Sequence, residues 1–95
     1  MDLGTGDGQF VCDLLNKGIN AIGVDIYLSE RQKQSKAFIE ADARKIPIPN
    51  DSVDFIYSSF SIFFEGYGEN FSDAFLIEAL NEAKRILKPR GKIRI

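Results

Sequence analysis

The feature that most constrains this chain is a glycine-rich loop close to its first residue, in the segment Asp2-Leu3-Gly4-Thr5-Gly6-Asp7-Gly8. Asp2 and Leu3 are typical of the end of a buried strand, and the glycines lead into a stretch with helical spacing of apolar residues. Gly4 and Gly6 can take backbone angles that a Cβ forbids, which lets a ligand lie directly against the main chain. The free N–H groups at the start of the next helix attract electron-rich or anionic groups. The segment therefore predicts a strand, a ligand-binding loop and a helix.

An acidic residue follows at the position where folds of this kind bind a ribose. Asp25 lies twenty-one residues beyond Gly4 and closes a second apolar stretch, Ala21-Ile22-Gly23-Val24. A carboxylate at the end of the second strand can accept hydrogen bonds from both ribose hydroxyls. The loop and Asp25 together predict a nucleoside cofactor.

The spacing of the glycines distinguishes between possible cofactors. The dinucleotide fingerprint is G-x-G-x-x-G, but here Gly4, Gly6 and Gly8 alternate and Gln9 stands where the third glycine belongs. A nucleotide-linked oxidoreductase is therefore disfavoured, and appreciable affinity for NADH would be needed to revive it. The sequence contains no G-x-x-x-x-G-K-[ST], so it lacks a phosphate-cradling P-loop.

Strands and helices are expected to alternate along the rest of the chain. Helices are predicted over residues 8–17, with Gly18 as a stop, over about two turns within 29–36, and from Ser72 as N-cap to a stop at Pro89 and Gly91. The last helix has an apolar stripe, formed by Leu76, Ile77, Leu80, Ala83 and Leu87. Strands are predicted at 2–3, 21–26, 37–40, 53–57 and 92–95, and the proline-containing stretch 46–51 is irregular. This order predicts an α/β fold with a mostly parallel sheet and right-handed connections, in one domain over residues 1–95.

Four candidate ligand-binding segments come directly after predicted strands. They are the loop 4–8, Asp25, Asp42-Ala43 and Ser58-Ser59. Because ligands of parallel α/β sheets bind at the carboxyl ends of the strands, all four are expected at one edge of the sheet.

Composition excludes several classes of function. The net charge of −2 gives no general attraction to nucleic acid or anionic membranes, and no apolar run is long enough to span a bilayer. The chain has no histidine, which excludes histidine-based triads and zinc sites, and no metal site is expected. Its single cysteine, Cys12, fits a reducing cytoplasm and is expected to pack as a small apolar residue in the first helix.

Half of the twelve basic residues nevertheless lie between Lys84 and Arg94. Two interpretations stay open for this basic cluster. Lys84, Arg85 and Lys88 can complement the negative end of a helix dipole, or the cluster can form a rim that contacts phosphates.

Nearly the whole chain resembles the class I S-adenosylmethionine-dependent methyltransferases, specifically the methyltransferase type 11-like domain. The matching pieces are the glycine segment 2–8, Gly23-Val24-Asp25-Ile26, Ala41-Asp42-Ala43, the stretch 46–56 and the stretch 82–92. The resemblance implies a Rossmann-like, mostly parallel sheet with helices on both faces. Relative to the family, the chain begins inside the first strand and stops in the fifth, so the last helix and the antiparallel strand pair are missing. The exposed fifth strand then suggests homodimerisation through the sheet edge.

The resemblance also implies S-adenosylmethionine as cofactor and assigns residues to its methionine end. The loop residues Gly4, Thr5, Gly6 and Gly8 would hold the methionine part. Asp2 would support the loop and reach the amino group, and Ser58 would offer its carbonyl near the same group.

The adenosine end of the cofactor is assigned to the next two strand ends. The resemblance implies that Asp25 binds the ribose hydroxyls and that Ile26 packs against the adenine. Asp42 would accept from the adenine amino group, and the Ala43 N–H would donate to a ring nitrogen. A simpler interpretation also stands: Asp2 and Asp25 cap neighbouring loops, and Asp42 starts a turn.

The function implied is methyl transfer to an unidentified acceptor, with a small molecule favoured and RNA as an alternative. A non-catalytic cofactor-binding core that needs a partner chain is the hypothesis from a different class. Glu65 and Glu69 are the carboxylates available as a base if one is needed. A group of aromatic residues either walls the acceptor pocket or belongs to the core, namely Phe60, Phe63, Phe64, Tyr67 and Phe71.

Overall fold

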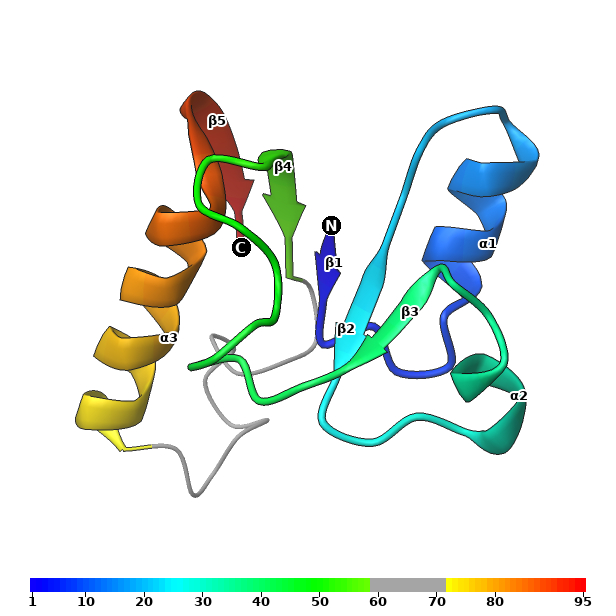
Figure 1. Cartoon of the computed structure of the whole chain (residues 1–95), viewed down its shortest axis with the longest axis horizontal. Coiled ribbons are helices and arrows are strands. Elements are labelled where there is room, and N and C mark those ends of the chain that lie inside the picture. Colours follow the sequence, from blue (N-terminus) through cyan, green and yellow to red (C-terminus); the bar gives the residue numbers. More distant parts are fainter. Residues whose placement is uncertain (59–71) are drawn as a thin grey trace.

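The computed structural model describes residues 1–58 and 72–95, and in them five parallel strands form one sheet (Figure 1). The strand order is β3-β2-β1-β4-β5, so the order reverses at β1, between β2 and β4. The strands are β1 (Asp2–Leu3), β2 (Gly23–Asp25), β3 (Phe38–Glu40), β4 (Val53–Tyr57) and β5 (Leu87–Arg94), and the helices are α1 (Gln9–Asn16), α2 (Glu30–Lys33) and α3 (Asp73–Ile86). The parallel α/β fold expected from the sequence is confirmed.

Helices cover both faces of the sheet, as expected. In Figure 1, α1 and α2 lie on one side of the molecule and α3 lies on the other. The ring of Phe10 on α1 packs against that of Tyr57 on β4, with 5.0 Å between the ring centroids. The neighbouring residue Ile56 points to the opposite face, where it joins the core beneath α3. This alternation is the period of two that a strand imposes on its side chains.

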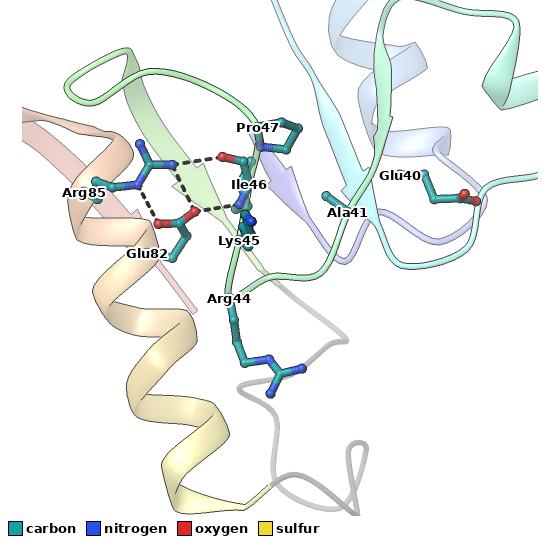
Figure 2. A pocket seen from close by; sticks show the side chains of 8 residues that line it. All are labelled: Glu40, Ala41, Arg44, Lys45, Ile46, Pro47, Glu82 and Arg85. Atoms are coloured by element: carbon teal, nitrogen blue, oxygen red, sulfur yellow. Dashed lines mark hydrogen bonds and ion pairs between the residues drawn. The ribbon is translucent and has the colours of Figure 1, made fainter.

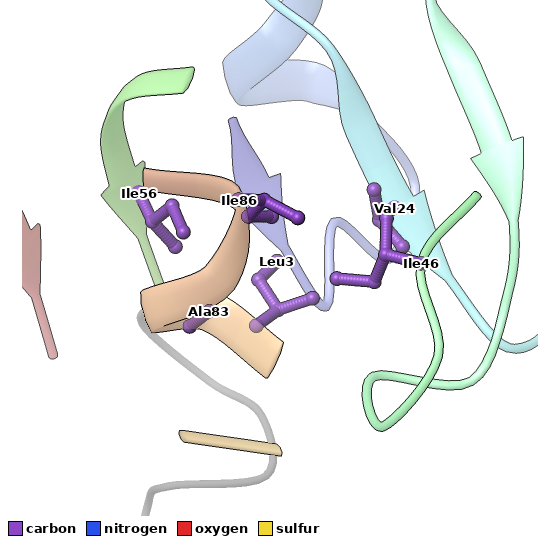
Figure 3. Packing of buried hydrophobic residues seen from close by; sticks show 6 residues of the cluster. All are labelled: Leu3, Val24, Ile46, Ile56, Ala83 and Ile86. Atoms are coloured by element: carbon purple, nitrogen blue, oxygen red, sulfur yellow. The ribbon is translucent and has the colours of Figure 1, made fainter. Parts of the chain in front are cut away.

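The main hydrophobic core lies between α3 and the sheet (Figure 3). Leu3, Val24 and Ile56 come from the three central strands, and each is at most 2% exposed. Ala83 and Ile86 of α3 and Ile46 of the irregular stretch complete the cluster. Because residues 79 and 83 are both alanine and fully buried, the helix can approach the sheet closely.

The helix ends follow the signals in the sequence. Gly8 is the N-cap of α1 with φ 81°, and Gly18 beyond its other end has φ 77°. The Ser72 hydroxyl accepts a hydrogen bond from Phe75 N at 3.1 Å, so the predicted N-cap of α3 is confirmed. Helix α2 begins with a capping box in which Ser29 and Gln32 bond reciprocally. It has four residues, which is shorter than the two turns expected.

Two expectations about the end of α3 are wrong. The helix ends at Ile86, so Pro89 and Gly91 do not end it, and β5 starts at Leu87 instead of at Lys92. Pro89 and Gly91 therefore lie within a strand. Lys88 precedes a proline, which disfavours helical angles there. Pro89 is tolerated because β5 is an edge strand of the described sheet and its pairing with β4 is interrupted by a bulge.

The predicted apolar stripe of α3 and the predicted packing of Cys12 on α1 are only partly correct. On α3 the buried positions are Ala79, Ala83 and Ile86, whereas Ile77 is 61% exposed and Leu80 is 39% exposed. The stripe is therefore displaced around the helix by about one residue. On α1 only Val11 is fully buried, and Cys12 is exposed instead of packed. Cys12 lies about 100° around the helix from Val11, so it turns away from the sheet when Val11 faces it.

Among the residues that the structure describes, no helix combines the length and the apolar composition needed to cross a bilayer.

The packing of the glycine loop against β3 can be tested with a matched pair of substitutions. Both Gly8 and Gly18 have left-handed φ angles, so alanine adds similar backbone strain at either position. A Cβ at Gly8 would lie 2.5 Å from Cζ of Phe38, whereas one at Gly18 would meet nothing within 4 Å. We expect Gly8→Ala to lower the free energy of unfolding by about 1–3 kcal/mol more than Gly18→Ala, as measured by urea denaturation. Equal losses would show that the loop is not packed tightly against Phe38.

Candidate functional site

The carboxyl ends of the central strands meet at one edge of the sheet and are joined there by backbone hydrogen bonds. Gly4 N donates to Val24 O at 2.7 Å, which links the glycine loop to β2. Ala41 N donates to Asp25 O at 2.9 Å, which links the residue after β3 to the same strand. Ser58 follows β4, whose neighbour on the other side is β1. The segments expected to share an edge therefore do so as far as the structure describes them, next to the reversal of strand order, and Ser59 lies outside the described residues.

The glycine loop adopts a conformation that requires glycine. Gly4, Gly6 and Gly8 have φ angles of 80°, 59° and 81°, all in the left-handed region. Gly6 and Asp7 are exposed at the surface, whereas Gly8 is buried against the ring of Phe38 and the amide of Gln32. The loop thus turns one side of its backbone to solvent and packs the other side on the protein.

The Asp25 carboxylate is bound to the glycine loop in this structure. Its Oδ2 accepts a hydrogen bond from Gly6 N at 2.9 Å, and its Oδ1 accepts one from Tyr27 N at 3.2 Å. The carboxylate therefore caps the loop, as the simpler interpretation of Asp25 expects. Each carboxylate oxygen can accept two hydrogen bonds, so one acceptor position on each remains for ribose hydroxyls.

Asp2 lies beneath the loop and is 7% exposed. Burial raises the pKa of its carboxyl above the usual range, and the nearby Asp25 charge acts in the same direction. The Thr5 side chain lowers the Asp2 pKa against these effects, although Thr5 Oγ1 is buried and has no hydrogen-bond partner of good geometry in the described part of the chain. A cationic group placed here would favour the ionised form of Asp2.

Asp42 and Ala43 follow β3 in a turn that is fixed by Arg44. Asp42 O accepts from Lys45 N at 2.9 Å and Asp42 Oδ1 accepts from Arg44 N at 2.9 Å, so Asp42 starts a turn. The Arg44 guanidinium also donates to both carboxylate oxygens, which lowers the pKa of Asp42. Oδ2 accepts one bond from Arg44, so it retains a position for an amino group.

The remaining site residues are placed as follows. Ile26 is 55% exposed at the end of β2, where an adenine ring could cover it. Ser58 is buried, and its N–H donates to Arg94 O. The candidate bases Glu65 and Glu69 and the aromatic residues Phe60, Phe63, Phe64, Tyr67 and Phe71 lie outside the described residues.

Two polar side chains that the sequence analysis did not single out, Gln32 and Arg44, hold the loops of this edge, and Arg85 of the basic cluster holds the irregular stretch. Gln32 donates from Nε2 to Gly6 O at 2.9 Å. Arg44 reaches from Asp42 to Glu78 on α3 at 3.7 Å and lies over the Phe75 ring at 4.8 Å from its centroid. Arg85 donates to the carbonyls of the irregular stretch. Only the capping box at Ser29 and Gln32 had a signal in the sequence, because it follows the S-x-x-Q pattern.

Arg85 and Glu82 clamp the irregular stretch onto α3, beside a groove of about 530 Å³ (Figure 2). Arg85 donates to Ile46 O at 2.9 Å and to Ile48 O at 3.0 Å, and Glu82 Oε2 accepts from Ile46 N at 2.6 Å. The hydrogen bonds from Arg85 lower the pKa of Glu82. The groove is lined by Glu40, Ala41, Arg44, Lys45, Ile46, Pro47, Glu82 and Arg85.

The basic cluster between Lys84 and Arg94 does not form one uniform surface. Arg85 is bound to the irregular stretch, and Lys88 pairs with Asp54 at 3.0 Å. Lys92 and Arg94 pair in register with Phe55 and Tyr57, so they lie on the α1 side of the sheet, away from α3. Cations on different faces cannot contact one stretch of phosphates together.

The whole chain, residues 1–95, matches the family model described as a methyltransferase domain. The biotin biosynthesis bifunctional protein BioHC of Cellvibrio japonicus is 30% identical over 98 residues, which cover 97% of this chain and 18% of that protein. Among solved structures, the PH0226 protein of Pyrococcus horikoshii has a TM-score of 0.75 and 31% identity, covering 97% of this chain and 42% of that one. An S-adenosylmethionine-dependent methyltransferase from Archaeoglobus fulgidus has a TM-score of 0.69 and 26% identity, covering 97% and 41%.

This chain thus spans less than half the length of each of these relatives. The family model nevertheless covers every residue, and the parallel α/β sheet with its glycine loop agrees with the resemblance found in the sequence. The chain belongs to the methyltransferase domain family, as a class I, S-adenosylmethionine-dependent methyltransferase domain.

Proposed function

We propose that the carboxyl edge formed by β1, β2 and β3 binds S-adenosylmethionine and that the protein transfers its methyl group to a small molecule. The observation that supports this most directly is the 2.9 Å hydrogen bond between Gly6 N and Asp25 Oδ2. This bond places the loop backbone, which is suited to the methionine part, next to the carboxylate that is suited to the ribose. One ligand can therefore contact both. Both lie where the strand order reverses, the usual ligand position of parallel α/β sheets.

The residues present fit this cofactor. Asp2 and Asp25 provide negative charge for a ligand that bears an ammonium and a sulfonium group. Asp7 N–H, on an exposed residue, has no partner among residues 1–58 and 72–95 and is free to donate to a carboxylate. Asp25 keeps acceptor positions for the ribose. Ile26, Asp42 and Ala43 surround the expected adenine position.

When bound, S-adenosylmethionine supplies a methyl group on a sulfonium that leaves as a neutral thioether. The protein's own contribution is to hold the donor in line with an acceptor and to exclude water. Rigid loops serve this purpose because a small misplacement of the reacting atoms costs much of the rate. The hydrogen bonds that hold Gly6 and the Asp42 turn in place are therefore the part of the described structure that would position the cofactor for methyl transfer.

A small-molecule acceptor is favoured over RNA by two observations. The relative from Cellvibrio japonicus is named for biotin biosynthesis, which concerns a small molecule. The basic cluster is divided between two faces and partly committed to internal contacts, so it offers no continuous phosphate-binding strip. Steeply salt-dependent binding of RNA would reverse this preference.

Calorimetric titration with S-adenosylmethionine, S-adenosylhomocysteine and NADH tests the cofactor assignment. We expect micromolar binding of the first two and none of NADH. Asp25→Ala should weaken binding of S-adenosylmethionine by about 1–3 kcal/mol, because the ribose hydroxyls lose a charged acceptor. Asp54→Ala is the matched control, since Asp54 lies on β4 and is bound only to Lys88 in the described structure. Equal affinity of wild type and a folded Asp25→Ala protein would show that the ribose assignment is wrong.

Binding of S-adenosylmethionine should also depend on pH through Asp2. Its pKa is raised in the folded protein, so the carboxyl is still partly neutral above the usual range of an aspartate. The positively charged amino group prefers ionised Asp2, so affinity should rise with pH through this raised pKa and then become constant. Asp2→Asn should remove this rise and leave weaker binding at neutral pH. Titrations between about pH 4 and about pH 8 measure it, and an unchanged profile in Asp2→Asn would place the amino group elsewhere.

The alternative is a domain that binds the cofactor without transferring its methyl group. Incubation with S-adenosylmethionine carrying a labelled methyl group, in a cell extract, distinguishes the two. Label on a small molecule supports the proposed function, and label on RNA points to the other acceptor class. Tight binding with no label on any acceptor favours a binding module.

A further inference from the structure

The Gln32 side chain connects helix α2 to the glycine loop. It is 8% exposed, and its Nε2 donates to Gly6 O at 2.9 Å across twenty-six residues of sequence. Its Oε1 accepts from Ser29 N at 2.9 Å. Because Gly6 O can only accept and Ser29 N can only donate, these two partners fix which end of the amide is which. Both ends of the side chain are therefore used.

Gly6 is held on both of its peptide groups. Its N–H is bonded to the Asp25 carboxylate and its C=O is bonded to Gln32. A Cβ at Gly8 would lie 3.0 Å from Gln32 Nε2, which shows how closely the loop is packed on this amide. Asp25 comes from β2 and Gln32 from α2, so two separate elements fix one exposed residue of the loop.

The bond to Gln32 determines the direction of the next N–H group. In a trans peptide the C=O and the N–H point in opposite directions, and the structure contains no cis peptide among its described residues. Because Gln32 holds Gly6 C=O toward α2, the N–H of Asp7 in the same peptide points away from α2. That N–H has no partner in the described part of the chain, and Asp7 is exposed. It is available to a ligand at the open edge.

We infer that Gln32 is a positioning residue of the cofactor site, which orients the Gly6–Asp7 peptide so that Asp7 N–H donates to the carboxylate of the cofactor's methionine part. This inference rests on the proposed function. Gln32 does not touch the cofactor itself and acts through Gly6. Loss of its donor would remove the hydrogen bond to Gly6 C=O and let the Gly6–Asp7 peptide rotate.

The alternative role of Gln32 is to cap α2 and nothing more. Gln32→Glu separates the two roles, because glutamate at this position still accepts from Ser29 N in a capping box but has no N–H for Gly6 O. Ser29→Ala is the matched control. It removes the hydroxyl that accepts from Gln32 N at 3.1 Å and leaves the amide of Gln32 in place.

The test is calorimetric titration of the full chain with S-adenosylhomocysteine as probe. At about pH 8 we expect Gln32→Glu to weaken binding by about tenfold or more and Ser29→Ala by about twofold at most. As the pH falls, the introduced carboxyl becomes protonated and can donate to Gly6 O, so the ratio of the variant's affinity to that of wild type should recover. The other titratable groups of this region are the same in both proteins, so the comparison with wild type isolates the effect of the introduced carboxyl; they are Asp2, Asp7, Asp25, Lys33 and Glu40.

Three outcomes would overturn the inference: wild-type affinity in Gln32→Glu, an equal loss in Ser29→Ala, or a loss that does not recover at low pH.

If the wild-type chain does not bind the probe, the proposed cofactor site fails instead. Gln32 is then tested without ligand by amide hydrogen exchange of Gly6. The Gly6 N–H belongs to the peptide before the one that Gln32 holds, so its exchange reports whether loss of the Gln32 bond loosens Gly6 and its hydrogen bond to Asp25. The exchange should be about tenfold faster in Gln32→Glu and nearly unchanged in Ser29→Ala. Equal exchange rates of the Gly6 amide in wild type and both variants would refute the positioning role of Gln32.

Discussion

The hydrogen bond between Gly6 N–H and the Asp25 carboxylate connects the two segments on which the whole site depends. One is a loop that needs left-handed angles at three glycines, and the other is the end of a buried strand. Neither is stable in this form alone: Thr5 is the only buried side chain of the loop, and the strand has three residues. The bond joins them only because β1 and β2 run parallel and in register, Leu3 beside Val24. Sheet register therefore sets the geometry at which a ligand would meet both.

Much of this arrangement is predictable from the sequence, because it follows from periodicity and from the topology of parallel sheets. The strand at 53–57 and the N-cap at Ser72 are where apolar pattern and capping chemistry place them. What could not be predicted are contacts from side chains to distant backbone. Gln32 and Arg44 belong to polar stretches with no period, and Arg85 is a polar residue of a periodic helix. The backbone partners of Gln32 and Arg85, like the Glu78 partner of Arg44, become neighbours only after the chain has folded. The buried face of α3 differs from the predicted stripe for a related reason: Ala79 is small, and a stripe chosen by hydrophobicity prefers Ile77 and Leu80.

The two ends of the proposed cofactor site are stabilised by different means. At the methionine end the glycine loop is packed against α2 and β3 by Gln32 and Phe38. At the adenine end no helix stands between β3 and β4 within the described chain, and the connection is fixed by charged side chains of α3 and its neighbours. Arg44 ties Asp42 to Glu78, and Arg85 with Glu82 holds Ile46. Because these ion pairs are partly exposed, they contribute direction and order to the loop more than they contribute to global stability.

The charge at this edge explains why the glycine loop fits a sulfonium nucleoside better than a dinucleotide. Asp2 is buried under the loop and Asp25 is bonded to it, and the charge of Asp25 disfavours ionisation of Asp2. A diphosphate placed against the loop would add negative charge beside both, whereas an ammonium or sulfonium relieves their repulsion. The same arrangement in a dinucleotide site would need the loop's N–H groups to outweigh two carboxylates. In this chain one of those N–H groups, that of Gly6, is already bonded to Asp25. The loop is therefore suited by its electrostatics, as well as by its glycine spacing, to a cofactor that is cationic near the methionine end.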